Sequence, residues 1–451
     1  MSALDSLADR LADRLPGLLA AGGVPGAGLA VLVGDEIVEH AAGVLNTTTG
    51  VAATTDSIFQ IGSITKIWTA TLAMQLVDEG RLDLDAPVRE YLPGFRLRDE
   101  SAARTVTARH LAAHTAGFDG DVVPPVEWGD QALAAFVDGL GGVGQIFPPG
   151  LMFSYNNLGY VVLGRLVEVL RGRPYDQCLR EHLLAPLGIT HAAPTPWEAV
   201  MRRTAVGHIG GEPAPHYAPG RLEAPAGSVL AMRARDLLTF VRMHLRDGLA
   251  DDGTRVLSRA GTRLMRSVQV EQPDLGCPGD ARGLGWALYG RPGGTLIGHN
   301  GGTVGQNAYL RVVPERGIAV ALLTNGGDPA HVYEEVVGGV LAELAGIIPP
   351  PRPAPAADPR VVDAWRYVGV YANDVAETTV EQDASGRLWM TIKPIGAGSV
   401  LLGAPEPVEL LAYRGDTLLT AGEHTAVAFL GDDGQGRALY GHAGRAVRRV
   451  A

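Results

Sequence analysis

The spacing of apolar residues predicts the first elements of the chain. Leucines recur at near-helical intervals over residues 3–20, which predicts an amphipathic helix interrupted at Pro16. Two apolar runs, 28–33 and 36–40, flank a Gly-Asp pair, a pattern typical of a β-hairpin. The chain is therefore expected to open with a helix followed by an antiparallel strand pair.

Helices dominate the middle of the predicted structure, and strands return later. Residues 64–79 are apolar on most sides and end at Gly80, which indicates a buried helix with a glycine C-cap. The spacing over 105–275 is mainly helical with long loops, most clearly at 158–170 and 234–245. Predicted strands and a final helix follow at 284–289, 295–299, 308–313, 317–324 and 331–345.

A change of pattern near residue 347 predicts a domain boundary. Residues 1–346 carry the elements above, and 347–360 form a proline-rich linker that we expect to be extended and fairly stiff. In 361–451, roughly seven or eight short strands alternate with turns. This pattern predicts a small antiparallel barrel or sandwich.

Composition excludes one class of partner. With 451 residues, of which 46% are hydrophobic and 19% charged, the chain is typical of a globular protein with more than one compact unit. The net charge of −11 disfavours contact with a nucleic-acid backbone, since only the tail with Arg445, Arg448 and Arg449 is locally basic. We therefore expect no nucleic-acid partner.

Cysteines and hydropathy bear on cofactors and location. Cys178 and Cys277 lack metal-site spacing and are predicted to be free thiols, with a disulfide as the open alternative. No zinc or haem signature is present, so no cofactor and no metal are expected. The N-terminus has acidic residues where a signal peptide needs bases, and no run of about twenty apolar residues predicts a membrane span. We expect a cytoplasmic protein with no membrane partner.

Ser63-Ile64-Thr65-Lys66 is the first stretch with chemical meaning. Residues i and i+3 of a helix face the same side, so Ser63 and Lys66 are neighbours if a helix begins here. A buried lysine with a lowered pKa can accept the proton of a serine hydroxyl and make it a nucleophile. The alternative is a helix N-cap followed by a surface lysine, because S-x-x-K alone is a common coincidence.

Two further motifs strengthen this interpretation. Tyr155 and Asn157 follow a turn just before a predicted helix, where a phenol near a lysine can shuttle a proton and an amide can hold both lysine and substrate. A packed tyrosine with a turn asparagine is the alternative. His299 begins His-Asn-Gly-Gly, where glycines let a substrate lie against an edge strand. A phosphate-binding loop is rejected there because no Lys-Ser/Thr follows.

Together, S-x-x-K, Y-x-N and H-x-G resemble the serine β-lactamase-like superfamily, in the branch of class C β-lactamases, D-alanyl-D-alanine carboxypeptidases, D-aminopeptidases and related esterases. The resemblance covers about residues 20–345. It implies an α/β (α+β) domain beside an all-helical subdomain, here at about 100–275, with the cleft between them. Peptide-cyclising relatives carry a lipocalin-like barrel, which is the fold expected for 361–451. Further segments that share the likeness are 79–88, 105–118, 186–188 and 283–286.

The resemblance implies a role for each motif residue. Ser63 attacks an acyl carbon and forms an acyl-enzyme. Lys66 and Tyr155 handle the proton, and neither is assigned alone as the base. Asn157 positions Lys66 and the substrate amide. The backbone N–H groups of Ser63 and Gly302 form the oxyanion hole.

His299 departs from the lysine of K-T-G, which attracts a substrate carboxylate in relatives. Its loss disfavours β-lactamase and D,D-carboxypeptidase activity and is more typical of esterase, aminopeptidase and acyltransferase members. Asn300 and Gly301 are expected to bind substrate. Arg445 is expected on the surface or, in the sharper hypothesis, in the cleft, where it binds a substrate carboxylate with two hydrogen bonds.

Other residues have plainer interpretations. His110 and His114 are predicted to cap or pack a helix, and Trp68 is predicted to lie in the core. The remaining predictions place Asp119 and Asp121 in a solvated loop and Arg448 and Arg449 on the surface.

Three functions remain open. The first is hydrolysis, as in a cytoplasmic serine esterase, a D-aminopeptidase or a D-amino-acid amidase. The second is acyl transfer, as in the penicillin-binding-protein-type thioesterases, which take a peptidyl thioester from a carrier protein of a nonribosomal peptide synthetase and cyclise it head to tail. The third is non-catalytic peptide binding, which is disfavoured because the motif residues are all present.

Four features favour the cyclase. They are the missing export signal, the β-rich second domain, the overall length and a composition rich in alanine, glycine and arginine. In this interpretation the resemblance also implies a D-residue at the acyl end of the substrate.

Overall fold

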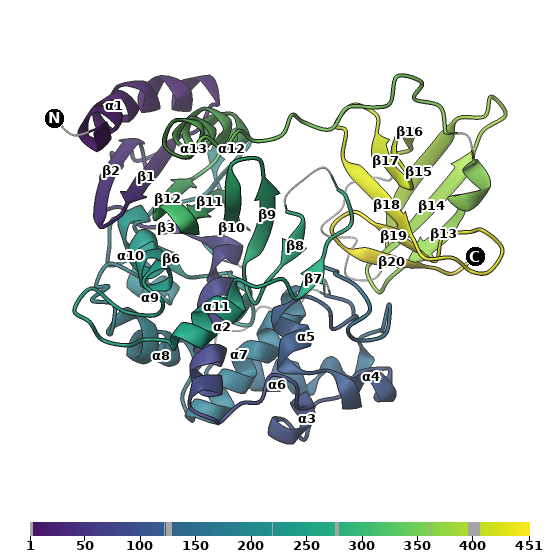
Figure 1. Cartoon of the computed structure of the whole chain (residues 1–451), viewed down its shortest axis with the longest axis horizontal. Helices are drawn as coiled ribbons and strands as arrows, with labels where there is room; N and C mark the ends of the chain where they lie inside the picture. Colours follow the sequence, from purple (N-terminus) through teal and green to yellow (C-terminus); the bar gives the residue numbers. More distant parts are fainter. Residues whose placement is uncertain are drawn as a thin grey trace.

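The computed structural model describes residues 3–120, 122, 129–218, 220–275, 279–361, 363–395 and 406–451. A large body built on a central sheet is joined by an extended linker to a smaller closed barrel (Figure 1). This arrangement confirms the predicted fold class. Among the described residues, no helix is long and apolar enough to cross a membrane.

The central sheet joins strands from both ends of the body. β1 (Gly26–Val33) pairs antiparallel with β12 (Ile318–Thr324), so that Ala27 lies opposite Thr324. The strand order is β2-β1-β12-β11-β10-β9-β8-β7. The other members are β2 (Glu36–Gly43), β7 (Val270–Glu271), β8 (Ala281–Arg282), β9 (Ala287–Arg291), β10 (Gly294–Thr303) and β11 (Gln306–Val313), and two short pairs are β3 (Phe59–Gln60) with β6 (Ala231–Met232) and β4 (His208–Ile209) with β5 (Glu212–Pro213).

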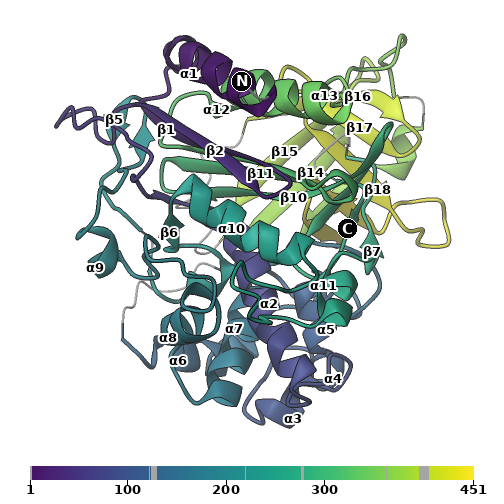
Figure 2. The same ribbon diagram turned by 60° about the vertical axis from the view of Figure 1, so that its left-hand side comes forward.

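Successive side chains of β1 point to opposite faces of the sheet and contribute to a separate hydrophobic core on each face. Leu29 and Val31 pack with α1 (Ala3–Ala21), whereas Ala30 and Leu32 belong to the core that contains α2 (Thr65–Asp78) and α10 (Ala234–Leu245). Figure 2 shows α1 and α13 on one side of the strands and α10 on the other. The sheet is therefore covered on both faces, which explains why β1 reads as a continuous apolar run.

Two predicted boundaries are wrong. The first helix continues through Pro16, because Leu15 and Leu19 on either side of it are buried against the sheet. The strand predicted at 284–289 begins only at Ala287. Gly285 before it has φ of +85° and lies against α2, so this stretch turns instead of extending.

The remaining helices lie mainly on one side of the body (Figure 1). α7 contacts both α2 and α5 and lies at the centre of this helical part. The bounds are α3 (Val88–Tyr91), α4 (Glu100–Thr105), α5 (Ala108–Ala112), α6 (Ala132–Asp138), α7 (Asn157–Arg171), α8 (Tyr175–Leu179), α9 (Pro196–Ala199), α11 (Arg259–Met265), α12 (Pro329–Tyr333) and α13 (Gly339–Ala345).

Eight strands close the barrel in sequence order, β13 to β20. Its seam pairs Tyr371 with Arg449, and the Arg449 side chain donates to the carbonyls of Val368 and Ala438. The surface position predicted for Arg449 is therefore wrong, since its guanidinium fastens the seam. The bounds are β13 (Gly369–Ala372), β14 (Ala376–Gln382), β15 (Leu388–Pro394), β16 (Val408–Arg414), β17 (Thr417–Thr420), β18 (Ala426–Leu430), β19 (Tyr440–His442) and β20 (Ala446–Arg449).

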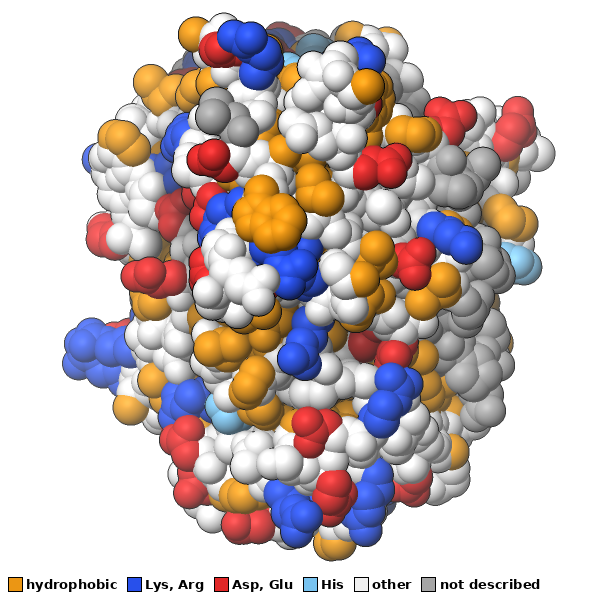
Figure 3. All heavy atoms as spheres, turned by 90° about the vertical axis from the view of Figure 1, so that its right-hand side faces the viewer, with side chains coloured by type: hydrophobic (Ala, Val, Ile, Leu, Met, Phe, Trp, Pro, Cys, Tyr) orange, Lys and Arg blue, Asp and Glu red, His pale blue; other side chains and the backbone are white. Residues whose placement is uncertain are grey.

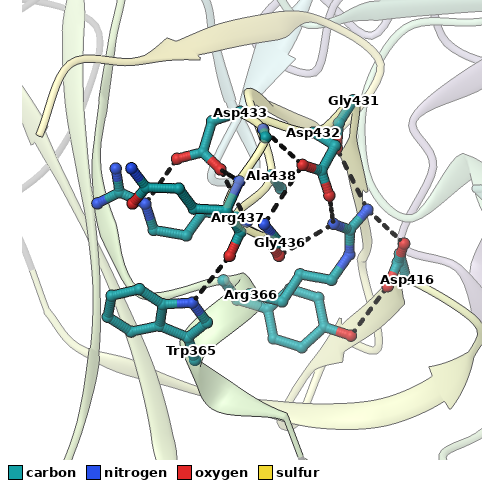
Figure 4. A network of polar contacts seen from close by, with 12 residues as sticks. Trp365, Arg366, Asp416, Gly431, Asp432, Asp433, Gly436, Arg437 and Ala438 are labelled. Atoms are coloured by element: carbon teal, nitrogen blue, oxygen red, sulfur yellow. Dashed lines mark hydrogen bonds and ion pairs between the residues drawn. The ribbon is translucent and has the colours of Figure 1, made fainter.

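Ion pairs fix the loops at one part of the barrel (Figure 4). Arg366 pairs with Asp416 at 2.7 Å and with Asp432 at 3.5 Å, and Asp433 pairs with Arg437 at 2.7 Å. On the face of the molecule drawn in Figure 3, charged side chains of both signs are interspersed with apolar ones. No single sign dominates this face.

The hairpin of β19 and β20 joins the barrel to the body. The His442 Nε2 donates to the Phe153 carbonyl at 2.8 Å, the Tyr155 N–H donates to the Gly444 carbonyl at 3.0 Å, and the Ala446 N–H donates to the Ser154 hydroxyl at 3.0 Å. The chain segment that carries Tyr155 is thus held by hydrogen bonds from the second domain. A small apolar cluster beside it contains Ile146, Phe147, Tyr440 and Ala446.

Candidate active site

Ser63 lies in a short 3-10 turn, Gly62–Ile64, that leads directly into α2. The Lys66 Nζ lies 3.0 Å from the Ser63 Oγ and donates a second hydrogen bond of 2.6 Å to the Ala226 carbonyl. Lys66 is fully buried, which excludes the alternative of a surface lysine. The spacing of three residues therefore places an amine against the candidate nucleophile.

Tyr155 reaches the same point from the segment before α7. Lys66 and Ser63 both act on the pKa of its phenol, and the Lys66 Nζ lies 4.9 Å from the ring centroid. The His114 ring stacks on the phenol ring with centroids 4.4 Å apart. His114 has φ of +60° and its Nδ1 accepts a hydrogen bond from the Asn156 N–H, so its predicted packing role is one of supporting the tyrosine.

Charge and burial shift the pKa values of the two groups that can carry the proton, Lys66 and Tyr155. Burial lowers the pKa of Lys66, although Tyr155 opposes that change. Burial alone raises the pKa of Tyr155, but the charge of Lys66, the hydrogen bonds from Lys66 and Ser63 and the charge of Arg282 outweigh it, so its pKa is lowered. Either group can then accept the Ser63 proton at a pH below the ordinary value for its type.

β10 brings a second backbone amide to the nucleophile. An ideal Cβ on Gly62 would lie 2.5 Å from the Gly302 nitrogen, and Gly62 has φ of +52°. The Gly302 position itself is open, with only the Asn307 Oδ1 at 4.0 Å. The N–H groups of Ser63 and Gly302 therefore lie on neighbouring backbone segments, as an oxyanion hole requires.

Gly301 lies against the segment that precedes Ser63. A Cβ there would lie 2.0 Å from the Ile61 carbonyl oxygen, so the missing side chain accommodates the segment that precedes Ser63. The neighbouring Asn300 is exposed, on the opposite face of the strand. Substrate contact by Asn300 and Gly301 stays a prediction, and for Gly301 such a contact would come from its backbone.

His299 is buried near the tyrosine, with ring centroids 6.1 Å apart. Its Nδ1 contacts the Asn300 carbonyl, and its buried Nε2 has no partner among the described residues. Burial, with the charges of Arg282 and Lys66, lowers the pKa of His299 well below its ordinary value. The ring is neutral near pH 7, so its expected stabilising role is that of a neutral hydrogen-bonding group.

Asn157 begins α7 beside the site, while Asn156 caps the helix through the Gly159 N–H. In the described part of the chain, the partners of the Lys66 ammonium are Ser63, Tyr155 and the Ala226 carbonyl. A hydrogen bond from Asn157 to Lys66 is not found among the described residues, in which the Ala226 carbonyl accepts from the lysine. Its contact with a substrate amide stays a prediction.

Arg445 comes from the turn between β19 and β20. Its guanidinium carbon lies 5.1 Å from the centroid of the Tyr155 ring, and its side chain is exposed. The structure thus brings this barrel residue beside the motif residues. Arg448 is exposed, as predicted.

Sequence reasoning missed one residue of the site. Arg282, in β8, is buried with its guanidinium carbon 5.9 Å from the Tyr155 ring centroid. A single arginine in a segment with no clear helical or strand pattern does not indicate a functional residue. The sequence feature closest to Arg282 that pointed to the site was the Gly-Leu-Gly-Trp stretch that follows it.

The plainer predictions have mixed outcomes. His110 caps α5 with Thr107, and Trp68 lies in the core, stacked on Phe240 at 3.8 Å, as predicted. The prediction of a solvated loop is wrong for Asp119. This side chain is buried and accepts a 2.8 Å hydrogen bond from the Asp374 N–H in the barrel. Cys178 is a buried free thiol. The predictions for Asp121 and Cys277 lie outside the described residues.

Comparison with known proteins gives matches over this whole arrangement. The family model described as Beta-lactamase matches residues 8–338. Penicillin-binding protein 4 of Amycolatopsis lactamdurans is 46% identical over 363 residues, which cover 78% of this chain and 94% of that protein. SurE, a solved structure, is 30% identical with a TM-score of 0.81, and the match covers 100% of both chains.

A second crystal structure of SurE, determined with D-Leu, matches with a TM-score of 0.79 at 29% identity over 99% of this chain and 100% of that chain. The D-amino acid amidase from Ochrobactrum anthropi SV3, complexed with L-phenylalanine amide, is 25% identical with a TM-score of 0.61. That match covers 74% of this chain and 99% of the amidase. The SurE matches therefore extend over both parts of the chain, whereas the amidase match does not.

We expect Gly62→Ala to slow labelling of Ser63 by a fluorophosphonate at least about 100-fold, because a methyl group there separates the two oxyanion-hole amides. The rate would be followed by intact-protein mass spectrometry. Gly34→Ala is the matched control, since Gly34 has a similar φ of +60° but nothing within 4 Å of its Cβ position. It should lose about 1–2 kcal/mol of stability and keep its labelling rate. Wild-type labelling of a folded Gly62→Ala protein would contradict this account of the site.

Proposed function

This chain belongs to the Beta-lactamase family, whose members are serine hydrolases, and on that premise we propose that it releases a nonribosomal peptidyl thioester by head-to-tail macrocyclisation. The observation that supports the proposal best is the full-length likeness to SurE, barrel included. A second supporting observation is that Arg445, a residue of the barrel, lies beside Tyr155. The second domain thus contributes to the site.

Acylation begins at Ser63. Its proton passes to the Lys66–Tyr155 pair while the Oγ attacks the thioester carbon. The negative charge that develops on the carbonyl oxygen is stabilised by the N–H groups of Ser63 and Gly302. The carbon–sulfur bond then breaks, the thiol leaves with a proton returned by the pair, and the acyl group remains as an ester on Ser63.

Deacylation decides between ring and free acid. The peptide's own N-terminal amine attacks the Ser63 ester and loses a proton to Tyr155 or Lys66, which closes the ring and restores the serine. Water competes for the same ester, so cyclisation needs a site from which water is excluded. The barrel lies against the segment that carries Tyr155, where it is well placed to cover the bound peptide.

The substrate is proposed to end in a D-residue at the acyl position. Two observations support this configuration: SurE was crystallised with D-Leu, and a second similar protein is a D-amino acid amidase. A carrier protein of a nonribosomal peptide synthetase is the proposed source of the thioester. In relatives, a lysine at the position of His299 attracts a substrate carboxylate. A histidine at this position agrees with a substrate that has no free carboxylate next to its acyl end.

Hydrolysis of a D-residue amide or ester is the second candidate. The match to the D-amino acid amidase favours it, since that protein shares the body of this chain. The amidase match leaves about a quarter of this chain unmatched, so it gives the barrel no role. Cyclisation is preferred for that reason.

The proposal predicts the mass of the product. Incubation of the full chain with a linear peptidyl thioester mimic ending in a D-residue should release the thiol and give a peptide one water lighter than the free acid, as seen by mass spectrometry. Ser63→Ala should give neither product. Free acid alone, or cleavage of simple nitrophenyl esters with no turnover of the thioester, would return the chain to the hydrolases.

Arg445→Ala should raise KM for an intermolecular acceptor that carries a free carboxylate by about 10- to 100-fold, because a charge-assisted hydrogen bond contributes about 1.5–3 kcal/mol. The same change should leave KM for the matching amide acceptor nearly unaltered. Arg448→Ala, which removes an exposed cation from the same hairpin, is the matched control. Unchanged kinetics in Arg445→Ala would rule out the carboxylate-binding role.

A further inference from the structure

Arg282 is a buried cation that lies beside the reactive tyrosine. The catalytic steps described above do not use this arginine. It ends β8 and is only 6% exposed. Its guanidinium carbon lies 5.1 Å from the ring centroid of Phe153 and 5.9 Å from that of Tyr155. It therefore lies against the same segment that the barrel hairpin holds from the other domain.

The guanidinium has a fixed position. Its Nε donates a hydrogen bond to the Gln272 Oε1, and the Gln272 side-chain amide donates in turn to the Gly279 carbonyl at 3.0 Å. The Gln272 backbone N–H is bonded to the Asp280 carbonyl at 2.9 Å. Gln272, which follows β7, thus holds the charged group of Arg282 in place through hydrogen bonds.

A buried charge is costly unless a group of opposite charge compensates it. The ion pairs among the described residues do not include Arg282; the groups whose charges act on it most are the phenols of Tyr289, Tyr155 and Tyr160 and the guanidinium of Arg311. Tyr160 donates to a backbone carbonyl, and burial raises its pKa, so it stays neutral. Arg311 already lies over the Tyr289 ring, at 5.0 Å.

The titratable groups that lie nearest the tyrosine are cationic or neutral, and the carboxylate of Glu223 acts on Lys66. Lys66 and Arg445 are cations, with Nζ and Cζ 4.9 Å and 5.1 Å from the Tyr155 ring centroid. Burial lowers the pKa of His114 and of His299 well below the ordinary value, so both rings are neutral near pH 7. Within the described part of the chain, Tyr155 is thus the group best placed to balance the guanidinium by becoming an anion.

We propose that Arg282 is a positioning residue whose buried charge holds the Tyr155 phenol as a phenolate, ready to accept the Ser63 proton. The proton moves from the Ser63 Oγ to the Tyr155 oxygen as the serine attacks, while Arg282 keeps all its protons and forms no bond. The inference rests on the proposed role of Tyr155 as a proton acceptor. It deepens that role by naming the charge that sustains it.

The test is the pH dependence of Ser63 labelling by a fluorophosphonate in the full-length protein, which needs no knowledge of the peptide substrate. Loss of the cation should raise the pKa of the phenol, so the acidic limb of the rate profile should move to higher pH in Arg282→Gln. We expect a movement of about one pH unit or more, which makes labelling at a pH on the acidic limb about tenfold slower or worse. Arg282→Lys, which keeps the charge, should restore most of the profile.

Arg291→Gln is the matched control, because it removes a cation of the neighbouring strand that is paired with Asp280. Its profile should equal that of the wild type. Gln272→Leu, which keeps the charge but releases the guanidinium, should move the limb in the same direction by a smaller amount, and it serves if Arg282→Gln does not fold.

Two results would overturn the inference: an unchanged limb in the folded variants, or a shift that Arg282→Lys reproduces in full, since packing rather than charge would then be responsible. Tyr155→Phe separates this failure from that of the proposed function. If Tyr155→Phe labels at the wild-type rate across the pH range, the proposed proton acceptor is itself wrong.

Discussion

The attraction between one phenol and the cations that surround it is the interaction on which this site depends. Lys66, Arg445 and Arg282 have their charged atoms 4.9, 5.1 and 5.9 Å from the centroid of the Tyr155 ring. Burial alone would keep the phenol protonated, and the surrounding positive charge reverses that tendency. Reactivity at Ser63 therefore comes from electrostatics arranged in advance by the fold.

Three parts of the chain must meet for that arrangement to exist. The turn before α2 supplies Ser63 and Lys66, the segment before α7 supplies Tyr155, and β10 supplies the second amide. Glycine makes the closest of these contacts possible, because at Gly62 any side chain would overlap β10. The barrel adds a further constraint, since the hairpin around His442 is hydrogen-bonded to the segment that holds Tyr155. The second domain is thus part of the construction of the site.

The sequence allowed the fold class and the meeting of its motifs to be predicted, because helical spacing, strand alternation and the three short motifs are local signals. The interruption predicted at Pro16 was wrong, because burial of the leucines on both sides of it keeps the helix intact. Asp119 and Arg282 could not be placed for another reason. Their burial depends on contacts with residues far away in the sequence, Asp374 in the barrel and the Phe153–Tyr155 segment. Arg449 was wrongly predicted to lie on the surface because a basic tail resembles a solvated terminus, although this residue closes the barrel seam.

The ionisation of Tyr155 is the central claim, and carbon-13 NMR of protein labelled at the tyrosine ring carbon that bears the hydroxyl tests it most directly. One resonance, absent from Tyr155→Phe, should titrate with a pKa below the ordinary value of 10 and show phenolate character while the other tyrosines remain phenols. A Tyr155 resonance that stays in the phenol form up to pH 10 would contradict the account and leave Lys66 as the proton acceptor.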